Sequence, residues 1–272
     1  MNPPAPGPFH AGAGTGRRAA PRGLAGRGED GSGIARSGGP LGRDLAADLA
    51  AASRVLADQG VVDAFGHVSI RHPAAADRFW IPRSMAPALV MPDDLMEFTL
   101  AGVACDGDDR PAFLERFIHG EIYRARADVN AVVHSHSPSV IPFGLTRAPL
   151  RAMFHNAGFL AAEIPVFDIA EKFGATDMLV GSPEKGVELA RVAGTAPVVL
   201  MRGHGLAAVG PDLRTAVFRA VYTEVNARIQ HQAVALGGPL AALSAEEGAL
   251  ADAVNLRSAA RAWEYWMGRV GR

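Results

Sequence analysis

The chain has 272 residues and a mass of 28.4 kDa, and 49% of its residues are hydrophobic, so it can bury a sizeable core. Its charges nearly cancel, at a formal net charge of -1, which leaves no excess positive charge for a nucleic-acid backbone or an anionic lipid surface. The single cysteine, Cys105, excludes an internal disulfide. Without an apolar run of about 20 residues or a secretion signal, the sequence favours a cytoplasmic protein that spans no membrane.

Residues 1–40 are rich in glycine, proline, alanine and arginine and contain few large apolar side chains. Such a composition offers too little apolar burial to offset the entropy lost on ordering the backbone, so we expect a disordered tail. An organelle transit peptide is also rich in arginine and poor in acidic residues, but it is rich in serine and amphipathic as well, and this stretch is neither. We therefore place the folded domain at residues 41–272.

Helices and short strands alternate along this domain. Leu45, Leu49, Ala52 and Leu56 recur every three to four residues, which predicts a helix that ends near Gly60. Strand-like runs follow at 67–71, 78–81, 96–99, 130–135, 164–167 and 197–201. Further helices are expected to begin at Pro111, capped by Asp108 or Asp109, at Ser137 and at Ser182, and to span 212–236 and 244–267, the last with Ser244 and Glu247 spaced as a capping box. This order predicts a single α/β domain.

The segment 131–138, AVVHSHSP, ends an apolar strand with two histidines. Side chains alternate between the faces of a strand, so His134 and His136 project to the same side and can share a cation. Such a pair alone also fits a polar rim. However, the strand PVVLM ends in RGHG, and a histidine between two glycines, His204, can be aimed past a strand end. Three neutral imidazoles with open coordination positions indicate a catalytic site for a divalent metal ion.

The helix expected over residues 111–126 carries a fourth candidate. Glu115 and His119 lie at positions i and i+4, on one face of this helix, and the strand with the two histidines follows after a short turn. Glu115 can therefore reach the metal or the reacting atoms. The alternative for Glu115 is a solvated charge or an ion pair with Arg116 or Arg124. His119 fits a core histidine, or one that supports a ligand, better than a ligand.

Loop residues are weaker candidates for substrate contacts. Arg83 and Ser84 follow a strand in a proline-bounded loop, where the guanidinium either binds a carboxylate or lies on the surface. His155 precedes a glycine turn and either points into a pocket or is an ordinary loop histidine. The apolar side chains that could make room for a ring are Phe79, Trp80 and Phe154. Those expected to pack helices are Tyr222, Trp263 and Trp266.

Together these residues resemble the class II aldolase and adducin family. The segments HGEIYRARADVNAVVHSHSP and MRGHGLAAVG are similar to its two metal-binding segments, and the likeness covers roughly residues 44 to 240. The resemblance implies a central, mainly antiparallel β-sheet flanked by helices, and usually a homotetramer with active sites between subunits. It also implies one divalent ion per subunit, Fe2+, Mn2+ or Zn2+, held by His134, His136 and His204. Glu115 is then an acid/base group that can also approach the metal.

The segment that binds phosphate in the sugar-phosphate aldolases of this family differs here. Their loop is rich in Gly, Ser, Thr and Asn, whereas this chain reads DAFGHVSIRH, with His67 in the place of Asn, and then PRSMAP. These segments resemble a branch of metal-dependent decarboxylases of hydroxypyridine and hydroxyphthalate dicarboxylates. The branch includes non-haem iron oxygenases of aminocoumarin antibiotic biosynthesis, which act on prenylated hydroxyphenylpyruvate and mandelate. The resemblance thus implies decarboxylation, oxidative or not, of an aromatic hydroxy or keto acid. Together with the loop candidates above, the expected substrate contacts are Arg83, Ser84, His155 and His67.

The expected chemistry follows from the open metal positions. A metal that chelates a carboxylate and an adjacent hydroxyl or keto oxygen withdraws electrons from the carbon that carbon dioxide leaves. Glu115 would then protonate this carbon, which needs a carboxyl group whose pKa is raised by an apolar wall. The oxygenase would use iron(II) with the same ligands. The alternatives are aldol cleavage of an unphosphorylated hydroxy-keto acid and a non-catalytic, adducin-like interaction protein, although adducin-type chains tend to lose the histidines present here.

Overall fold

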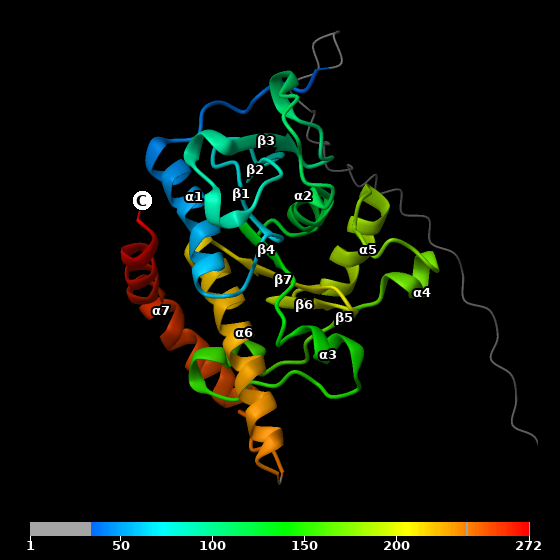
Figure 1. Ribbon diagram of the computed structural model, residues 1–272, viewed down its shortest axis with the longest axis vertical. Helices are drawn as coiled ribbons and strands as arrows, with labels where there is room; N and C mark the ends of the chain where they lie inside the picture. Colours follow the sequence, from blue (N-terminus) through cyan, green and yellow to red (C-terminus); the bar gives the residue numbers. More distant parts are fainter. Residues whose placement is uncertain (1–33, 238, 272) are drawn as a thin grey trace, which may run out of the picture.

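The protein is built on one seven-stranded sheet with helices on both faces (Figure 1). The computed structural model describes residues 34–237 and 239–271. The strands lie in the order β3-β2-β1-β4-β7-β6-β5, and all neighbours are antiparallel except β5 and β6. Their bounds are β1 His67–Arg71, β2 Arg78–Pro82, β3 Leu95–Thr99, β4 Ala131–Ser135, β5 Val166–Phe167, β6 Val198–Met201 and β7 Gly205–Gly210. The predicted α/β class with a central, mainly antiparallel sheet is therefore confirmed.

Helices cover the two faces of the sheet in separate groups (Figure 1). On one face α1, α6 and α7 pack together over a core that includes Leu49 and Val217, and on the other α2 and α5 enclose a core around Phe98 and Ile122. The helix bounds are α1 Arg43–Asp58, α2 Arg116–Ala125, α3 Ile141–Leu145, α4 Ile169–Phe173, α5 Pro183–Ala193, α6 Leu213–Ala235 and α7 Ala245–Val270. Across the described ranges, no helix combines the length and apolar character needed to cross a bilayer. With both faces covered, reactive side chains meet a substrate most easily near the strand ends.

Alternation along β4 sets the direction of the first predicted ligand. Val133 faces the core under α1 and α6, whereas Val132 faces the core under α2 and α5. His134 continues the second series, so its side chain points to the α2 side of the sheet. Its register partners are His67 on β1 and Ala207 on β7. The central position of β4 therefore places His134 between two neighbouring strands.

Local signals in the sequence define several helix ends. The side chains of Ser182 and Asp212 accept hydrogen bonds from the backbone of the first turns of α5 and α6. Ser244 and Glu247 form the predicted capping box of α7, because each side chain accepts a hydrogen bond from the backbone N–H of the other. These predicted helix starts are confirmed.

The helix expected to begin at Pro111 begins instead at Arg116, with Glu115 as its N-cap. The cause lies just before it, where the Arg110 guanidinium donates to backbone oxygens in the segment 93–95, at 2.7 and 2.8 Å. The chain is thereby held against the start of β3 and turns into a helix only later. As a result, Glu115 directly precedes the first turn of α2 and does not lie within it.

Two further elements differ from the sequence prediction. The helix expected from Ser137 is only a turn, and α3 begins at Ile141; the Ser137 hydroxyl donates to Glu224 and so does not cap a helix. The sequence does not predict β7, whose LAAVG run has a single β-branched residue, Val209. This strand exists because β4 and β6 both pair with it, which is tertiary context that local propensity does not contain.

Residues 34–40 belong to the expected tail, yet they are bonded to the domain. The Gly38 N–H donates to the buried Glu97 carboxylate at 2.8 Å, and the carbonyl of Gly39 accepts from His72 Nε2 at 2.9 Å. The folded domain therefore starts before residue 41. The rest of the expected tail lies outside the described residues.

Gly205, the first residue of β7, lies directly against β4. An added Cβ atom would lie 1.9 Å from the carbonyl oxygen of Ser135, and backbone does not move aside cheaply. We expect Gly205→Ala to push β7 away from β4 and to lower the free energy of unfolding by about 1–3 kcal/mol, the usual cost of overpacking. Urea denaturation measures this. Gly268→Ala, which points into open space on α7, is the control, and equal losses in both variants would contradict the interpretation.

Candidate metal centre

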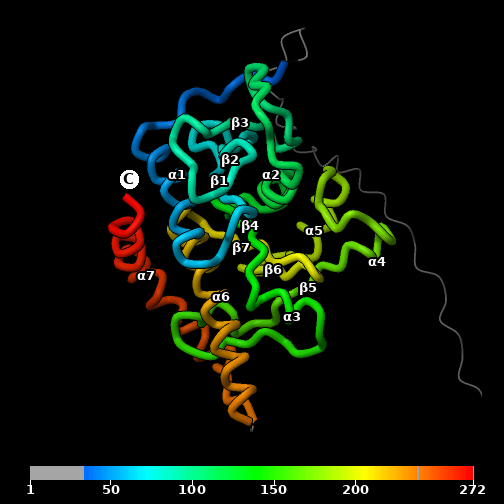
Figure 2. The backbone as a smooth tube through the Cα atoms, viewed as in Figure 1, coloured from blue at the N-terminus to red at the C-terminus, as the bar shows by residue number. Residues whose placement is uncertain are grey.

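Three histidines and one glutamate meet at one end of the sheet. His134 is the second-last residue of β4, His136 directly follows this strand, His204 lies in the turn between β6 and β7, and Glu115 occupies the N-cap position of α2. One ligand atom from each of these side chains lies within 4.8 Å of the other three. Figure 2 shows how β4, the β6–β7 pair and α2, which are far apart in the sequence, come together near the middle of the molecule. The structure thus gathers all four side chains that the sequence singles out as ligands.

The atoms that face one another are three imidazole nitrogens and one carboxylate oxygen. Nε2 of His136 lies 3.3 Å from Nε2 of His134 and 3.0 Å from Nε2 of His204. Oε2 of Glu115 lies 3.4 Å from Nε2 of both His134 and His204. His134 and Glu115 are buried, whereas His136 and His204 are partly exposed. The cluster therefore has a closed side in the protein and a side open to a ligand.

Backbone carbonyls fix the protons of two imidazoles. Nδ1 of His134 donates to the carbonyl oxygen of Leu206, and Nδ1 of His204 donates to that of Met178, each at 3.0 Å. A carbonyl cannot donate, so each Nδ1 carries the proton and each Nε2 presents a lone pair to the cluster. Lone pairs this close to one another and to the Glu115 carboxylate repel unless a cation lies between them. The donor set fits a divalent metal, and bonds from ligand histidines to backbone carbonyls are the usual support of such sites.

One loop supports two of the four ligands from behind. Besides the Met178 carbonyl, which holds His204, the backbone N–H of Val180 donates to Oε1 of Glu115 at 2.9 Å. Met178 has φ of 68°, in the left-handed region that residues other than glycine rarely adopt. Strain of this kind persists where the surroundings demand it, often at functional sites. Here it aims a carbonyl at a ligand histidine.

The charges of the cluster depend on burial and on mutual contact. Burial favours the neutral acid of Glu115, but a proton on His134 or His204 outweighs burial and holds the pKa of Glu115 below its ordinary value, as a bound cation in the same place would. Burial and the neighbouring imidazoles lower the pKa of His136 to about 4. Near neutral pH the cluster therefore offers an ionised carboxylate and a neutral His136, which are the forms that bind metal. The raised pKa expected for Glu115 is not what its surroundings produce.

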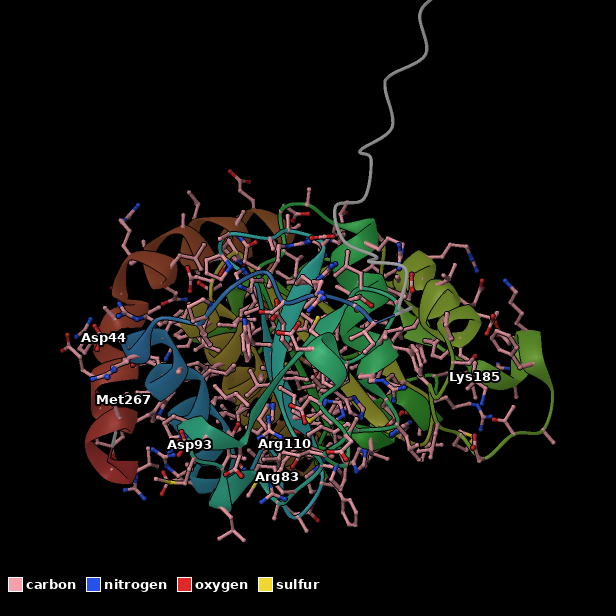
Figure 3. The ribbon with its side chains drawn as sticks, turned by 90° about the horizontal axis from the view of Figure 1, so that it is seen from above. Asp44, Arg83, Asp93, Arg110, Lys185 and Met267 are labelled. Atoms are coloured by element: carbon pink, nitrogen blue, oxygen red, sulfur yellow. The ribbon has the colours of Figure 1, made fainter. Side chains whose placement is uncertain are left out.

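The residues predicted to contact substrate are not all near this cluster. His67 is, because its ring centroid lies 5.1 Å from that of His134. Arg83 donates through Nε to the Asp94 carboxylate at 2.8 Å, on the β2–β3 side of the sheet; Figure 3 labels it beside Arg110, which binds the same 93–95 segment. Ser84 and His155 are exposed, the former next to Arg83. The structure brings only His67 of this group to the four ligands.

The three aromatic residues expected to make room for a ring do not form one pocket. Phe79 is fully buried in the core under α2, where it stacks on Phe98 and His119. Trp80, its neighbour on the same strand, packs against the core of the opposite face, as strand alternation requires. Phe154 packs near Tyr222 against the same core as Trp80, under α1, α6 and α7. The expectation was therefore wrong for Phe79.

An aromatic residue that the sequence analysis does not single out lies at the open side of the cluster. Phe65 is 64% exposed and stacks beside His136, with ring centroids 6.2 Å apart and an interplanar angle of 28°. The turn is formed by Asp63, whose carboxylate accepts the Phe65 N–H at 2.9 Å, and by Gly66 at φ of 100°. An exposed aromatic residue within an Asx turn, just before the His67 strand, is the signal that could have identified it.

The fold and the cluster together define an α/β protein with an open histidine–carboxylate centre. The family described as Class II Aldolase and Adducin N-terminal domain matches residues 47–231, so the chain belongs to the class II aldolase and adducin family. A solved aldolase II superfamily protein from Pseudomonas syringae shares the fold, with a TM-score of 0.71 and 20% identity over 85% of this chain and 94% of that chain.

Relatives with named activities fall in the branch that the sequence resembles. Decarboxylase tropJ of Talaromyces stipitatus is 36% identical over 233 residues, which cover 77% of this chain and 88% of the relative. A 3,4-dihydroxyphthalate decarboxylase of Terrabacter sp. is 31% identical over 245 residues, 84% of this chain and 97% of the relative. A 4-hydroxy-3-prenylphenylpyruvate oxygenase/4-hydroxy-3-prenylbenzoate synthase of Streptomyces roseochromogenus is 28% identical over 175 residues, 64% of this chain and 61% of the relative.

Removal of a converging nitrogen should remove the metal. We expect His134→Ala and His204→Ala each to weaken binding of a divalent ion by at least about 100-fold, more than loss of a supporting residue would. Zinc titration calorimetry and metal analysis of the purified protein measure this. His231→Ala, an exposed histidine on α6, is the control and should bind as the unchanged chain does. Undiminished zinc binding by the two ligand variants would contradict the assignment.

Proposed function

We propose that the protein decarboxylates an aromatic hydroxy or keto acid at a divalent metal ion held by His134, His136, His204 and Glu115. The single observation that carries the proposal is the convergence of three imidazole nitrogens and one carboxylate oxygen at a partly open surface. Three protein nitrogens leave coordination positions for a chelating substrate. Relatives named as decarboxylases, one of them of a dihydroxyphthalate, support this reaction class.

The bound metal would act as a Lewis acid on the substrate's carboxylate and neighbouring oxygen. Glu115 is ionised near neutral pH, because its imidazole neighbours lower its pKa despite its burial. It can therefore accept the proton of the substrate hydroxyl. The same proton then passes from Glu115 to the ring carbon as the bond between that carbon and the carboxylate breaks. Carbon dioxide and a phenolate are released, the phenolate takes a proton from water, and the protein is unchanged.

An aromatic substrate fits the side chains at the open side better than a sugar phosphate does. The exposed Phe65 ring next to His136 offers a flat apolar surface against which a ring can stack. His67 replaces a small polar residue of a phosphate loop, and its ring packs between those of Phe113 and His134. An imidazole enclosed in this way leaves less room for a cradle of backbone donors around phosphate.

The remaining expectations extend this proposal. We place the enzyme in the cytoplasm as a homotetramer with active sites between subunits. The exposed apolar side chain of Leu114, next to the proposed ligand Glu115, supports a subunit interface at the edge of the site. Within residues 34–237 and 239–271, Arg83, Ser84 and His155 form no hydrogen bond or ion pair with the four ligands, so we propose that they act on substrate across such an interface. Fe2+, Mn2+ and Zn2+ all remain compatible with three imidazoles and a carboxylate.

The reaction is tested with metal-loaded protein and 3,4-dihydroxyphthalate or a related aromatic hydroxy acid under anaerobic conditions. We expect carbon dioxide and the decarboxylated phenol in equal amounts, and no product after the metal is removed with a chelator. Product formation only in the presence of oxygen and iron(II) would favour the oxygenase, whose named relative is described above. An aldehyde product would favour aldol cleavage. No turnover of any acid by the metal-loaded protein would favour a non-catalytic, adducin-like role.

Glu115→Gln keeps the shape of the side chain but cannot take up and return a proton. We expect kcat to fall by about 100- to 10,000-fold, the usual contribution of a general acid–base group. Single-turnover assays at saturating metal measure the change, with metal content determined in parallel because Glu115 is also a candidate ligand. A variant that retains metal and turns over at the original rate would contradict the role of Glu115.

Phe65→Ala removes the proposed stacking surface without touching a ligand. We expect KM for an aromatic acid to rise by about 10-fold, in line with the stacking energy of an aromatic pair, and metal affinity to stay the same. Phe65→Tyr, which keeps the ring, is the matched control and should leave KM close to its original value. Equal KM values for the alanine variant and the unchanged protein would show that the substrate does not use this surface.

A further inference from the structure

A chain of hydrogen bonds inside the protein ends at His67, beside the metal centre. The Tyr123 hydroxyl lies 2.7 Å from Ser69 Oγ, which lies 2.6 Å from Nδ1 of His119. Nε2 of His119 lies in turn 2.7 Å from Nδ1 of His67. The four residues come from β1 and α2, and all are buried. Because Ser69 and His119 are both shielded from solvent, these hydrogen bonds orient groups inside the protein.

The direction of these hydrogen bonds follows from Tyr123, which lies at the opposite end of the series from His67. In the part of the chain that the structure describes, Ser69 Oγ is the hydrogen-bond partner of the buried Tyr123 hydroxyl, so the hydroxyl proton is donated to Ser69. Ser69 then donates to Nδ1 of His119, so the proton of His119 is on Nε2 and is donated to Nδ1 of His67. With Nδ1 occupied as an acceptor, neutral His67 carries its own proton on Nε2.

The Nε2 edge of His67 is thus a fixed donor beside the ligands. Its ring is packed between Phe113, at 4.4 Å between centroids, and His134, at 5.1 Å. Among the described residues, none forms a hydrogen bond with this Nε2 atom. This nitrogen is not among the fully enclosed atoms that lack a partner, so a bound ligand can reach it and accept its hydrogen bond.

We propose that His67 donates from Nε2 to the substrate oxygen on which negative charge develops as carbon dioxide leaves, and that His119, Ser69 and Tyr123 are positioning residues that hold it in this tautomer. The proposal rests on the function proposed above. As the bond to the carboxylate breaks, its electrons move into the ring and toward the hydroxyl or keto oxygen, so a donor at that oxygen helps the transition state more than the ground state. No proton needs to leave His67 for this.

The tautomer is tested without any turnover. Long-range proton–nitrogen correlation spectra of the zinc-loaded protein, made with nitrogen-15 histidine, should show His67 with a protonated Nε2 and an unprotonated Nδ1, assigned by the loss of its signals in His67→Gln. His119→Leu should abolish this single tautomer. An Nδ1-protonated or doubly protonated His67 in the unchanged chain would overturn the proposal. Because this spectrum needs no substrate, it can succeed even where the proposed decarboxylation fails.

The kinetic test separates positioning from general stability. We expect His119→Leu to lower kcat by about 100-fold, as loss of an oxyanion donor does, with little change in KM or in zinc affinity. His119→Gln, whose amide can still donate to Nδ1 of His67, should recover most of the rate, and exposed His231→Ala should match the unchanged chain. If His119→Leu does not fold, Tyr123→Phe, which removes only the terminal hydroxyl, takes its place with a smaller loss of kcat. Unchanged kcat in the folded variant would overturn the proposal.

Discussion

The structure depends on one electrostatic constraint: four acceptor atoms are brought together so that each lies 3.0–3.4 Å from two of the others, and a cation between them would relieve their repulsion. Such an arrangement is unfavourable by itself, so each side chain is held from behind. The carbonyls of Leu206 and Met178 fix two imidazoles, and the N–H of Val180 fixes the carboxylate of Glu115. These backbone hydrogen bonds thereby keep the proposed metal site preorganised.

The sheet supplies the rigid frame for this arrangement. β4 lies between β1 and β7, so its pairing places His67 and the turn that carries His204 on either side of His134. Helices on both faces bury the remaining strand residues in two cores, which leaves reactive groups at the strand ends. Because Gly205 lies directly against β4, His204 comes close to His134 and His136, where the three imidazoles could share an ion.

Much of this centre can be predicted from the sequence, because its strongest features are local. Strand alternation puts His134 and His136 on one side, and the glycines around His204 permit a turn at a strand end. What the sequence does not reveal arises from contacts between distant segments. β7 is a strand only through its neighbours. Glu115 occupies the N-cap position of α2 because Arg110 holds the preceding residues against β3, and Phe79 belongs to the core because its side of β2 faces α2.

The pKa shift of Glu115 and the contacts around the site cannot be predicted from the sequence either. A carboxyl group expected to have a raised pKa has a lowered one, since its imidazole neighbours outweigh its burial, and this changes Glu115 from a resting acid to a resting base. The hydrogen-bonded histidine pair His67 and His119 joins β1 to α2 across 52 residues of sequence, a link that no local pattern indicates. Phe65, exposed in a short turn, lacks the periodic neighbours that mark core aromatics.

The central claim is that these four side chains hold one divalent ion. The most direct measurement is a crystal structure of the metal-loaded protein with anomalous diffraction recorded at the absorption edge of the metal. The account predicts one strong anomalous peak per chain, about 2.0–2.2 Å from Nε2 of His134, His136 and His204, with the Glu115 carboxylate beside it. A metal peak elsewhere with these side chains unoccupied, or no peak from protein saturated with metal, would contradict it.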